Sequence, residues 1–331
     1  MYHLLKPLQA GSLTLSNRLV MPPMATAKAE PDGKVSEVLL DYYREKSQGG
    51  YIALIIIEHS YIMPEGKAGA NQLSVADDSV IPGLKQLAAL IHSQGSKAVM
   101  QINHAGSNTT SEIIGETPMG PSPIANPRRE ETPQELSPDD IRKIIKAFRD
   151  AAIRVKQAGF DGVEIHSAHG YLLNQFLSPV TNKRTDEYGG DILNRIRLHL
   201  EVIKEIKEAM GHDFPILVRL GAGDFMPGGI SVADIKTAAR CLEEAGVTII
   251  DVSGGIRGWN IPGLTIPVFF APLSAAIKSV VNIPVIVTGG ITDAETAEQV
   301  LADGQADLVG VGRAILRDSQ WAKNAVNREV N

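Results

Sequence analysis

Short apolar runs alternate with longer stretches of helical periodicity along almost the whole chain of 331 residues. This alternation predicts parallel strands joined by right-handed crossover helices, and most runs lack the polar alternation of a half-exposed strand. Eight strands, each followed by a helical segment, predict an α/β protein of the (β/α)8 TIM-barrel class. The runs are Leu19–Met24, Tyr51–Glu58, Lys97–Ile102, Gly162–His166, Ile216–Leu220, Thr248–Ser253, Val285–Thr288 and Asp307–Val311.

The segment after Leu136 shows how clearly the helices are marked. Ser137 suits the N-cap and Pro138 the first turn, and apolar residues then recur at helical spacing until Gly159. Similar patterns predict helices at Ser36–Ser47, Ile81–Gln94, Arg195–Met210, Val232–Ala245, Ala271–Val281 and Asp293–Ala302.

Long segments follow the third, fourth and sixth strands, where loops of such a barrel build the active site. The proline-rich segment Asn103–Leu136 is therefore expected to lie over the mouth as a lid. We find no boundary that divides the chain, so residues 1–331 are expected to form a single domain.

Composition excludes several classes of protein. With 38 acidic and 32 scattered basic residues, the formal charge of −6 makes nucleic acid an unexpected partner. No apolar run is long enough to cross a bilayer, and the first residues lack the features of a secretory signal, so a cytoplasmic location is expected. Cys241 is the only cysteine, which excludes a disulfide within the chain, a cysteine-rich zinc site and an iron–sulfur cluster held by cysteines.

The most informative polar residues follow the fourth strand. His166 ends it, and His169 and Tyr171 come within one tight loop. Two imidazoles can hold one substrate oxygen, and a phenol beside them can deliver a proton. For any one of these residues alone, a packing role would be a better explanation than a catalytic one. The three together favour a substrate-binding site. A metal held by Glu164, His166 and His169 is a weaker alternative because no dedicated metal motif is present, and we expect no metal.

The last two strands end in VTGGIT and VGVGRAIL, each a glycine-rich turn before a helix. Glycine lets backbone N–H groups approach an anion, and loops after strands seven and eight are the usual phosphate site of this barrel. Either turn alone is also an ordinary tight link. Both together indicate a phosphorylated ligand held by Gly289, Gly290, Gly312 and Arg313.

Two polar residues lie inside otherwise apolar strands, Gln101 in AVMQIN and Arg219 in ILVRL. A buried guanidinium needs a permanent acceptor, which Glu58, Glu164, Asp251 or an electron-rich ring of a ligand could supply. An internal ion pair that braces the barrel explains Arg219 equally well.

Seven segments together resemble the Old Yellow Enzyme family of FMN-dependent NAD(P)H:flavin oxidoreductases. They are NRLVMPPMATA, IIIEHSYI, MQINHAG, EIHSAHGYLLNQFLSPVTNKRTDEYGG, LVRLGAGDF, VTGGIT and VGVGRAIL, and they run in order from about Leu4 to Arg317. The block from HGYLLNQFLSP to NKRTDEYGG is highly specific.

The resemblance implies a TIM barrel with non-covalent FMN, which NADH or NADPH reduces and an electron-poor alkene, such as an α,β-unsaturated carbonyl compound, reoxidises. It implies flavin contacts from Pro23, Met24, Ala25, His59, Gln101 and Arg219, phosphate contacts from Gly290, Gly312 and Arg313, substrate binding by His166 and His169, and proton donation by Tyr171. A homo-oligomer is compatible with it. The alternative is a non-redox, phosphate-binding barrel lyase or isomerase, which would usually need a catalytic lysine or paired carboxylates at strand ends. Lys97 instead begins its strand.

Departures from the family pattern leave some contacts open. Ala25 stands where many members have Thr or Cys, although Thr26 could substitute, and Ala27 replaces a substrate-binding tyrosine of some relatives. Trp259 could wall the substrate pocket or simply pack under a loop. Arg328 could reach a neighbouring subunit's site, but a solvated tail charge is the more ordinary explanation. The dienoyl-CoA reductase branch adds iron–sulfur cysteines, so this chain is not expected to be that whole enzyme.

Overall fold

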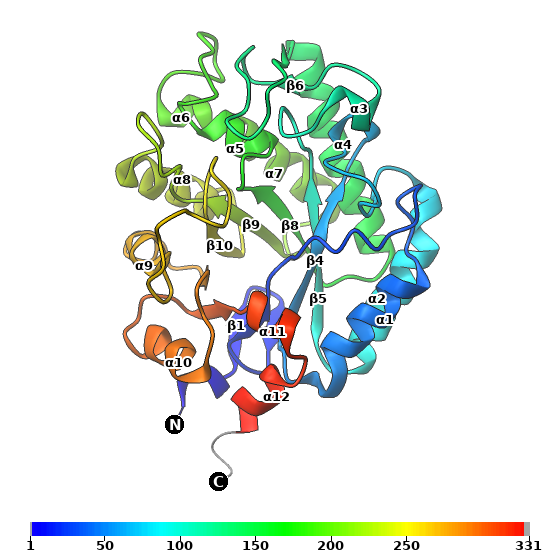
Figure 1. The fold of residues 1–331 in the computed structure, drawn as a ribbon, viewed down its shortest axis with the longest axis vertical. Coiled ribbons are helices and arrows are strands. Elements are labelled where there is room, and N and C mark those ends of the chain that lie inside the picture. The colour runs from blue at the N-terminus through cyan, green and yellow to red at the C-terminus, as the bar shows by residue number, and fades with distance from the viewer. Residues whose placement is uncertain (1, 328–331) are drawn as a thin grey trace.

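Eight parallel strands close into a barrel in the computed structural model, which describes residues 2–327 (Figure 1). The strands follow one another round the barrel in chain order, with β12 pairing with β3 to close it. The predicted TIM-barrel class is confirmed. The strands are β3 (Leu19–Met21), β4 (Leu54–Tyr61), β5 (Lys97–Asn103), β8 (Gly162–Ser167), β9 (Ile216–Gly221), β10 (Ile249–Ser253), β11 (Val285–Thr288) and β12 (Leu308–Gly310).

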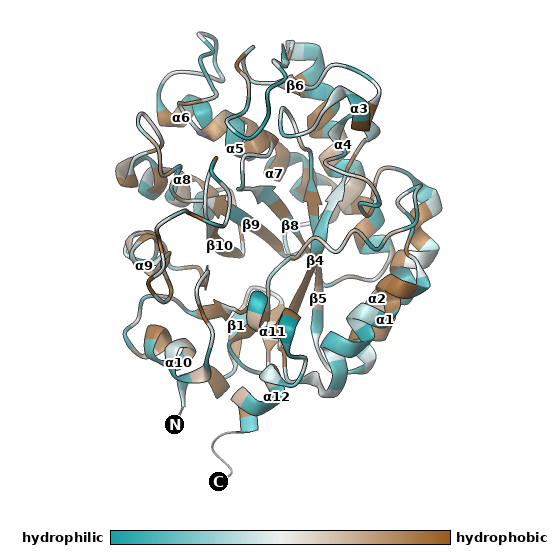
Figure 2. Ribbon diagram, viewed as in Figure 1, coloured by the Kyte–Doolittle hydropathy of each residue, from teal (hydrophilic) through white to brown (hydrophobic). Residues whose placement is uncertain are grey.

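Helices surround the barrel, and Figure 2 shows their brown, apolar sides turned towards the strands. Each of the seven predicted helices is present, and Ser137 caps its helix by accepting from the backbone N–H of Asp140. The principal helices are α1 (Glu37–Ser47), α2 (Ile81–Ser93), α4 (Pro138–Gln157), α7 (Arg197–Met210), α8 (Val232–Glu244), α9 (Ala271–Lys278) and α10 (Ala294–Ala302). Shorter ones are α3 (Ser111–Ile114), α5 (Leu172–Leu177), α6 (Ile192–Arg195), α11 (Arg313–Arg317), α12 (Trp321–Val326) and the 3-10 turns His3–Leu5, Gln48–Gly50, Pro64–Gly66 and Asp78–Val80.

Two strands differ from their predicted ranges by three residues, and the others differ by at most one residue at either end. The first strand was expected to reach Met24 but ends at Met21, because Pro22 and Pro23 have no N–H to donate to a ladder. The second begins three residues later than expected and extends to Tyr61, with a shift of register between Ile57 and Ser60. His59 lies in this irregular stretch, near the end of β4.

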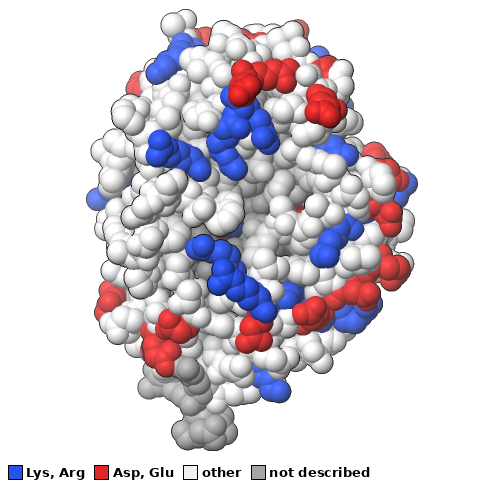
Figure 3. Space-filling view, viewed as in Figure 1, with Lys and Arg blue, Asp and Glu red and all other residues white. Residues whose placement is uncertain are grey.

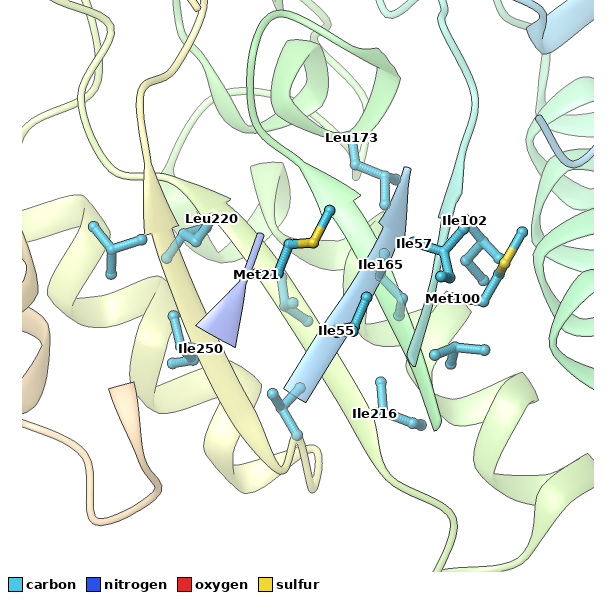
Figure 4. Close-up of a cluster of buried hydrophobic side chains, with 14 of the residues drawn as sticks. Met21, Ile55, Ile57, Met100, Ile102, Ile165, Leu173, Ile216, Leu220 and Ile250 are labelled. Atoms are coloured by element: carbon cyan, nitrogen blue, oxygen red, sulfur yellow. The ribbon is translucent and has the colours of Figure 1, made fainter. Parts of the chain in front are cut away.

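The lower half of the barrel interior is apolar. Its floor is a hairpin formed by β1 (Leu8–Ala10) and β2 (Leu13–Leu15), which was not predicted from the sequence. Leu13 and Leu15 are buried against inward-facing side chains of the strands, among them Leu54, Ile56, Val99, Leu217, Ile249, Ile286 and Leu308. The alternate residues face outward into the helix layer, as Figure 4 shows for Ile55, Ile57, Met100 and Ile165.

The same inward-facing rows become polar towards the carboxyl ends of the strands. Gln101 follows Val99 in its row, and Arg219 follows Leu217. Because side chains alternate along a strand, these residues lie above the apolar layer and inside the barrel. The sequence therefore places a layer of inward-facing polar residues at the mouth of the barrel.

The predicted lid segment Asn103–Leu136 contains α3 and a short strand pair, β6 (Met119–Gly120) with β7 (Gln134–Glu135). Arg184, from the NKRTDEYGG block, donates to the carbonyls of Pro121 and Leu136. Its buried side chain thus ties the base of the lid segment to the chain after β8. Among residues 2–327, no helix has the length and apolar character needed to cross a membrane.

Candidate active site

Three residues of the fourth barrel strand and its loop come together at the mouth. The His166 ring lies 5.1 Å from that of His169 and 4.9 Å from that of Tyr171, between ring centroids, with edge-to-face geometry. His166 is buried, and its Nδ1 has no hydrogen-bond partner in the described chain. We call His166, His169 and Tyr171 the mouth cluster.

The turn that carries the cluster is fixed by several contacts. His169 adopts a left-handed backbone conformation, with φ 58°, and its Nε2 lies 2.7 Å from Ser253 Oγ at the end of β10. Asn174 Oδ1 accepts from the N–H of Gly170, and Gln175 Nε2 donates to the Gly170 carbonyl. Asn174 and Gln175 therefore brace the turn, which explains why the HGYLLNQ segment acts as a unit.

Burial sets the protonation of the cluster. It lowers the pKa of both His166 and His169 well below the ordinary value, and the nearby Arg219 charge lowers them further. Burial raises the pKa of the Tyr171 phenol. At neutral pH the cluster is therefore two neutral imidazoles beside a protonated phenol.

His59 joins this cluster from β4. Its ring lies 5.2 Å from Tyr171 and 6.2 Å from His166, between centroids. Gln72 holds it, with Nε2 lying 2.7 Å from His59 Nδ1, and burial lowers the pKa of His59 to about 4. The sequence placed His59 near the flavin but did not place it against Tyr171.

Beneath the cluster lies a buried group of charged residues. Arg219 Nη1 lies 3.2 Å from Asp251 Oδ2, and Gln101 Nε2 donates to Glu164 Oε2. Burial raises the pKa of Asp251 to about 6 and that of Glu164 well above its usual range. Among the carboxylates considered as acceptors for Arg219, Asp251 is the one that pairs with it in the described chain. Its Nε and Nη1 still make no hydrogen bond of good geometry in the described chain.

Glu58 was considered as an acceptor for Arg219, but in the structure it binds Thr26. Its carboxylate accepts from both the backbone N–H and the hydroxyl of Thr26, at 2.6 and 2.7 Å. The Thr26 hydroxyl therefore donates to Glu58, and it is not available to replace the hydroxyl or thiol that is missing at Ala25. Ala27 has a left-handed φ of 53° in the same turn.

The two glycine turns have different neighbours, and only the turn after β12 lies beside the end of β3. Gly289 and Gly290 have positive φ angles of 91° and 79°, which favour glycine. A Cβ on Gly312 would come within 3.3 Å of Met24 Sδ, so the turn after β12 touches the segment from Pro23 to Ala25. Arg313 lies over the Trp259 ring, 5.6 Å from its centroid. Trp259 is thus next to Arg313, and no ring contact joins it to the mouth cluster in the described chain.

The lid segment supplies residues that the sequence reading did not single out. Asn108 Nδ2 and Arg128 Nη1 both donate to the His169 carbonyl, at 3.2 and 3.1 Å. Asn126 Nδ2 donates to the Gly170 carbonyl at 2.9 Å. The lid thus lies on the turn of the mouth cluster. Its residues gave no signal in the sequence because their contacts are long-range.

Two other expectations concern a metal and the C-terminus. Within residues 2–327, no group of three His, Cys, Asp or Glu side chains is arranged to hold a metal ion, the combination of Glu164, His166 and His169 included. Arg328 lies outside the residues that the structure describes.

The sequence profile of one family, described as NADH:flavin oxidoreductase / NADH oxidase, matches residues 3–330. The chain belongs to this family. The resemblance to Old Yellow Enzyme is confirmed, and family membership implies FMN as the cofactor and NAD(P)H as its reductant.

Two curated relatives illustrate the family. The NADH oxidase of Thermoanaerobacter brockii is 47% identical over 322 residues, which are 95% of this chain and 49% of that protein. The NADPH dehydrogenase of Bacillus licheniformis is 39% identical over 328 residues, 98% of this chain and 94% of that protein. The chain therefore spans about half the length of the first relative and nearly all of the second.

Solved structures agree with the fold. A 2-naphthoyl-CoA reductase in complex with 2-naphthoyl-CoA superposes with a TM-score of 0.92 at 27% identity, over 98% of this chain and 52% of that one. Morphinone reductase in complex with tetrahydroNAD gives a TM-score of 0.85 at 27% identity, over 99% of this chain and 91% of that one.

Proposed function

We propose that this barrel is an FMN-dependent ene-reductase, which uses NADH or NADPH to reduce the activated C=C bond of an α,β-unsaturated carbonyl or related compound. The mouth cluster is the observation that carries the proposal, because it brings two neutral imidazoles and a protonated phenol together at one end of the barrel. The names of the NADH oxidase and NADPH dehydrogenase relatives support a nicotinamide-dependent oxidoreductase.

The residues present fit an FMN at this mouth. Arg219 is buried yet retains N–H groups without hydrogen-bond partners, as expected of a side chain that faces an electron-rich ring. Gly312 touches Met24, so the turn assigned to the phosphate lies next to the backbone assigned to the ring. We infer that Gly289, Gly290, Gly312 and Arg313 hold the phosphate and that Pro23, Met24, Ala25 and Gln101 line the ring.

When bound, FMN supplies the exchange of hydride between the nicotinamide and the alkene. The imidazoles of His166 and His169 hold the carbonyl or nitro oxygen of the alkene by hydrogen bonds, which draws electron density away from its β-carbon. Tyr171 donates its phenolic proton to the α-carbon, so that the alkene gains one hydride and one proton in all. The raised pKa of Tyr171 keeps that proton in place until it is needed.

Arg219 would provide a permanent positive charge beside the bound ring. Asp251 offsets part of that charge, with Oδ2 at 3.2 Å from Arg219 Nη1. The non-redox alternative finds less support, because Lys97 pairs with Asp161 at the start of β5, away from the mouth.

A spectroscopic experiment tests the proposal. Purified protein, reconstituted with FMN where needed, should show a flavin spectrum that NADH or NADPH bleaches anaerobically and that cyclohexenone, N-ethylmaleimide or a nitroalkene restores. A protein that takes up no FMN would exclude the function. Bleaching without restoration by any of these alkenes would leave a flavin reductase but not an ene-reductase.

A further inference from the structure

Two neighbouring arginines of the lid segment, Arg128 and Arg129, have no carboxylate partner in the described chain, and Arg128 contacts the turn of the mouth cluster. Arg128 and Arg129 are both exposed and take part in no ion pair within residues 2–327. Other arginines of the chain, such as Arg184 and Arg195, are paired with aspartates. We call Arg128 and Arg129 the arginine pair.

The arginine pair is held in place. Asn126 is fully buried and donates to the Gly170 carbonyl, while its Oδ1 accepts from the N–H of Arg128 and its carbonyl accepts from that of Arg129. Arg128 Nη1 donates to the His169 carbonyl and lies close to Gly258, where an added Cβ would be 3.1 Å away. Asn126 thus fixes the backbone of the pair to the cluster turn, and the Arg128 side chain lies against both that turn and the loop after β10.

The charges of the pair act on the cluster. Arg128 and Arg129 both oppose the upward shift that burial gives to the pKa of Tyr171, and Arg128 also lowers the pKa of His169. Their positive field therefore extends to the atoms that would meet a substrate. Figure 3 shows Lys and Arg side chains on opposite sides of the hollow at the centre of this face.

We propose that Arg128 and Arg129 select an activated alkene that also carries a carboxylate, which they bind at the edge of the mouth cluster. This inference rests on the proposed function and names its substrate class. Guanidinium groups match the geometry of a carboxylate, and positive charge beside the mouth attracts a ligand of negative charge. A carboxylate at this edge leaves the carbonyl of the same molecule free to reach His166 and His169.

The test uses 4-carboxycinnamaldehyde and its methyl ester, which removes the negative charge and adds one methyl group. For the wild-type holoenzyme we expect kcat/KM for the acid to exceed that for the ester. In Arg128→Gln/Arg129→Gln, kcat/KM for the acid should fall about tenfold more than kcat/KM for the ester. Raising the salt from about 50 to about 500 mM should reduce the wild-type preference in the same direction.

Controls separate this role from a purely structural one. Arg240→Gln removes an exposed charge near the C-terminal end of α8 and should leave the ratio of acid to ester unchanged. Arg128→Lys/Arg129→Lys keeps the charge and should restore part of the preference. An equal loss on acid and ester would mean that the pair only supports the turn, and would overturn the proposal.

A comparison of NADPH with NADH tests whether the arginine pair binds the nicotinamide nucleotide instead of the alkene. If the double variant alters the ratio of NADPH to NADH use but leaves the acid-to-ester ratio as in wild type, the arginines bind the nicotinamide nucleotide and the proposal is wrong. Failure of the ene-reductase function itself is distinguishable, because then neither aldehyde would be reduced by any variant.

Discussion

His169 Nε2 lies 2.7 Å from Ser253 Oγ, which joins the loop after β8 to the end of β10, two strands further round the barrel. This contact fixes the ring of a residue whose backbone is already in the left-handed region. Ser253→Ala should therefore free the imidazole to rotate. We expect alkene reduction to slow about three- to tenfold, as for the loss of the hydrogen bond to His169, since the Arg219 Nη2 contact with the same hydroxyl is long, at 3.5 Å.

Stopped-flow measurement of flavin reoxidation by cyclohexenone would check this effect. Ser253→Thr keeps the hydroxyl and should recover most of the rate. If flavin reduction by NAD(P)H slows as much as reoxidation, Ser253 supports the barrel rather than the orientation of His169.

Tyr171→Phe removes the proposed proton donor and keeps the ring that packs against His59 and His166. Reoxidation by cyclohexenone should slow about 10²- to 10⁴-fold, the usual contribution of a positioned acid. Flavin reduction by the nicotinamide should stay within about twofold, since hydride transfer to the flavin needs no such proton. Equal losses in both half-reactions would refute the role of Tyr171.

Arg313→Gln tests the phosphate site with two ligands that share one ring system. FMN should bind about ten- to a hundredfold more weakly, because a charged hydrogen bond is lost, whereas riboflavin should be almost unaffected. Fluorescence titration of both ligands against apoprotein gives the comparison. Arg317→Gln, at the exposed end of α11, is the matched control. A similar loss for riboflavin would place Arg313 away from the phosphate.

Buried histidines should make stability depend on pH. Burial lowers the pKa of His59 and His104 to about 4 and that of His199 to about 3. Between these values and about 6.5, the unfolded chain binds more protons than the folded one, so stability falls on acidification. From pH 7 to pH 5, each such histidine should remove about 2 kcal/mol from the free energy of unfolding.

Asp251 acts in the opposite direction. Its folded pKa of about 6 lies above the unfolded value, so its contribution to stability is lost as pH rises and recovered as pH falls. Urea unfolding at both pH values measures the net effect. His199→Gln should reduce the difference between pH 7 and pH 5, whereas the exposed His212→Gln should not. A difference unchanged by His199→Gln would contradict the assignment.

The barrel could be predicted because its strands are covered on both faces and read as apolar runs. Boundaries were less certain where backbone chemistry intervenes, as at Pro22 and Pro23, or where a strand changes register, as after Ile57. The hairpin Leu8–Leu15 was missed because strands of three residues are too short to display a period.

The candidate site was predictable where its residues are neighbours in sequence, as in the mouth cluster. The partners of those residues were not, because they come from other strands and loops. Ser253 ends a predicted strand and could have been noticed as a polar residue at a strand end. Arg128 is an exposed charge in a loop, and the stacking of Arg313 on Trp259 joins two distant segments, so neither leaves a local signal.

The hairpin that fills the barrel floor has a kinetic consequence. Leu13 and Leu15 are packed into that end, so a ring bound in the barrel would be reached from the mouth. Under the proposed function, we therefore expect the nicotinamide to leave before the alkene enters. Initial rates measured across both concentrations should then give parallel double-reciprocal lines, the pattern of a substituted-enzyme mechanism.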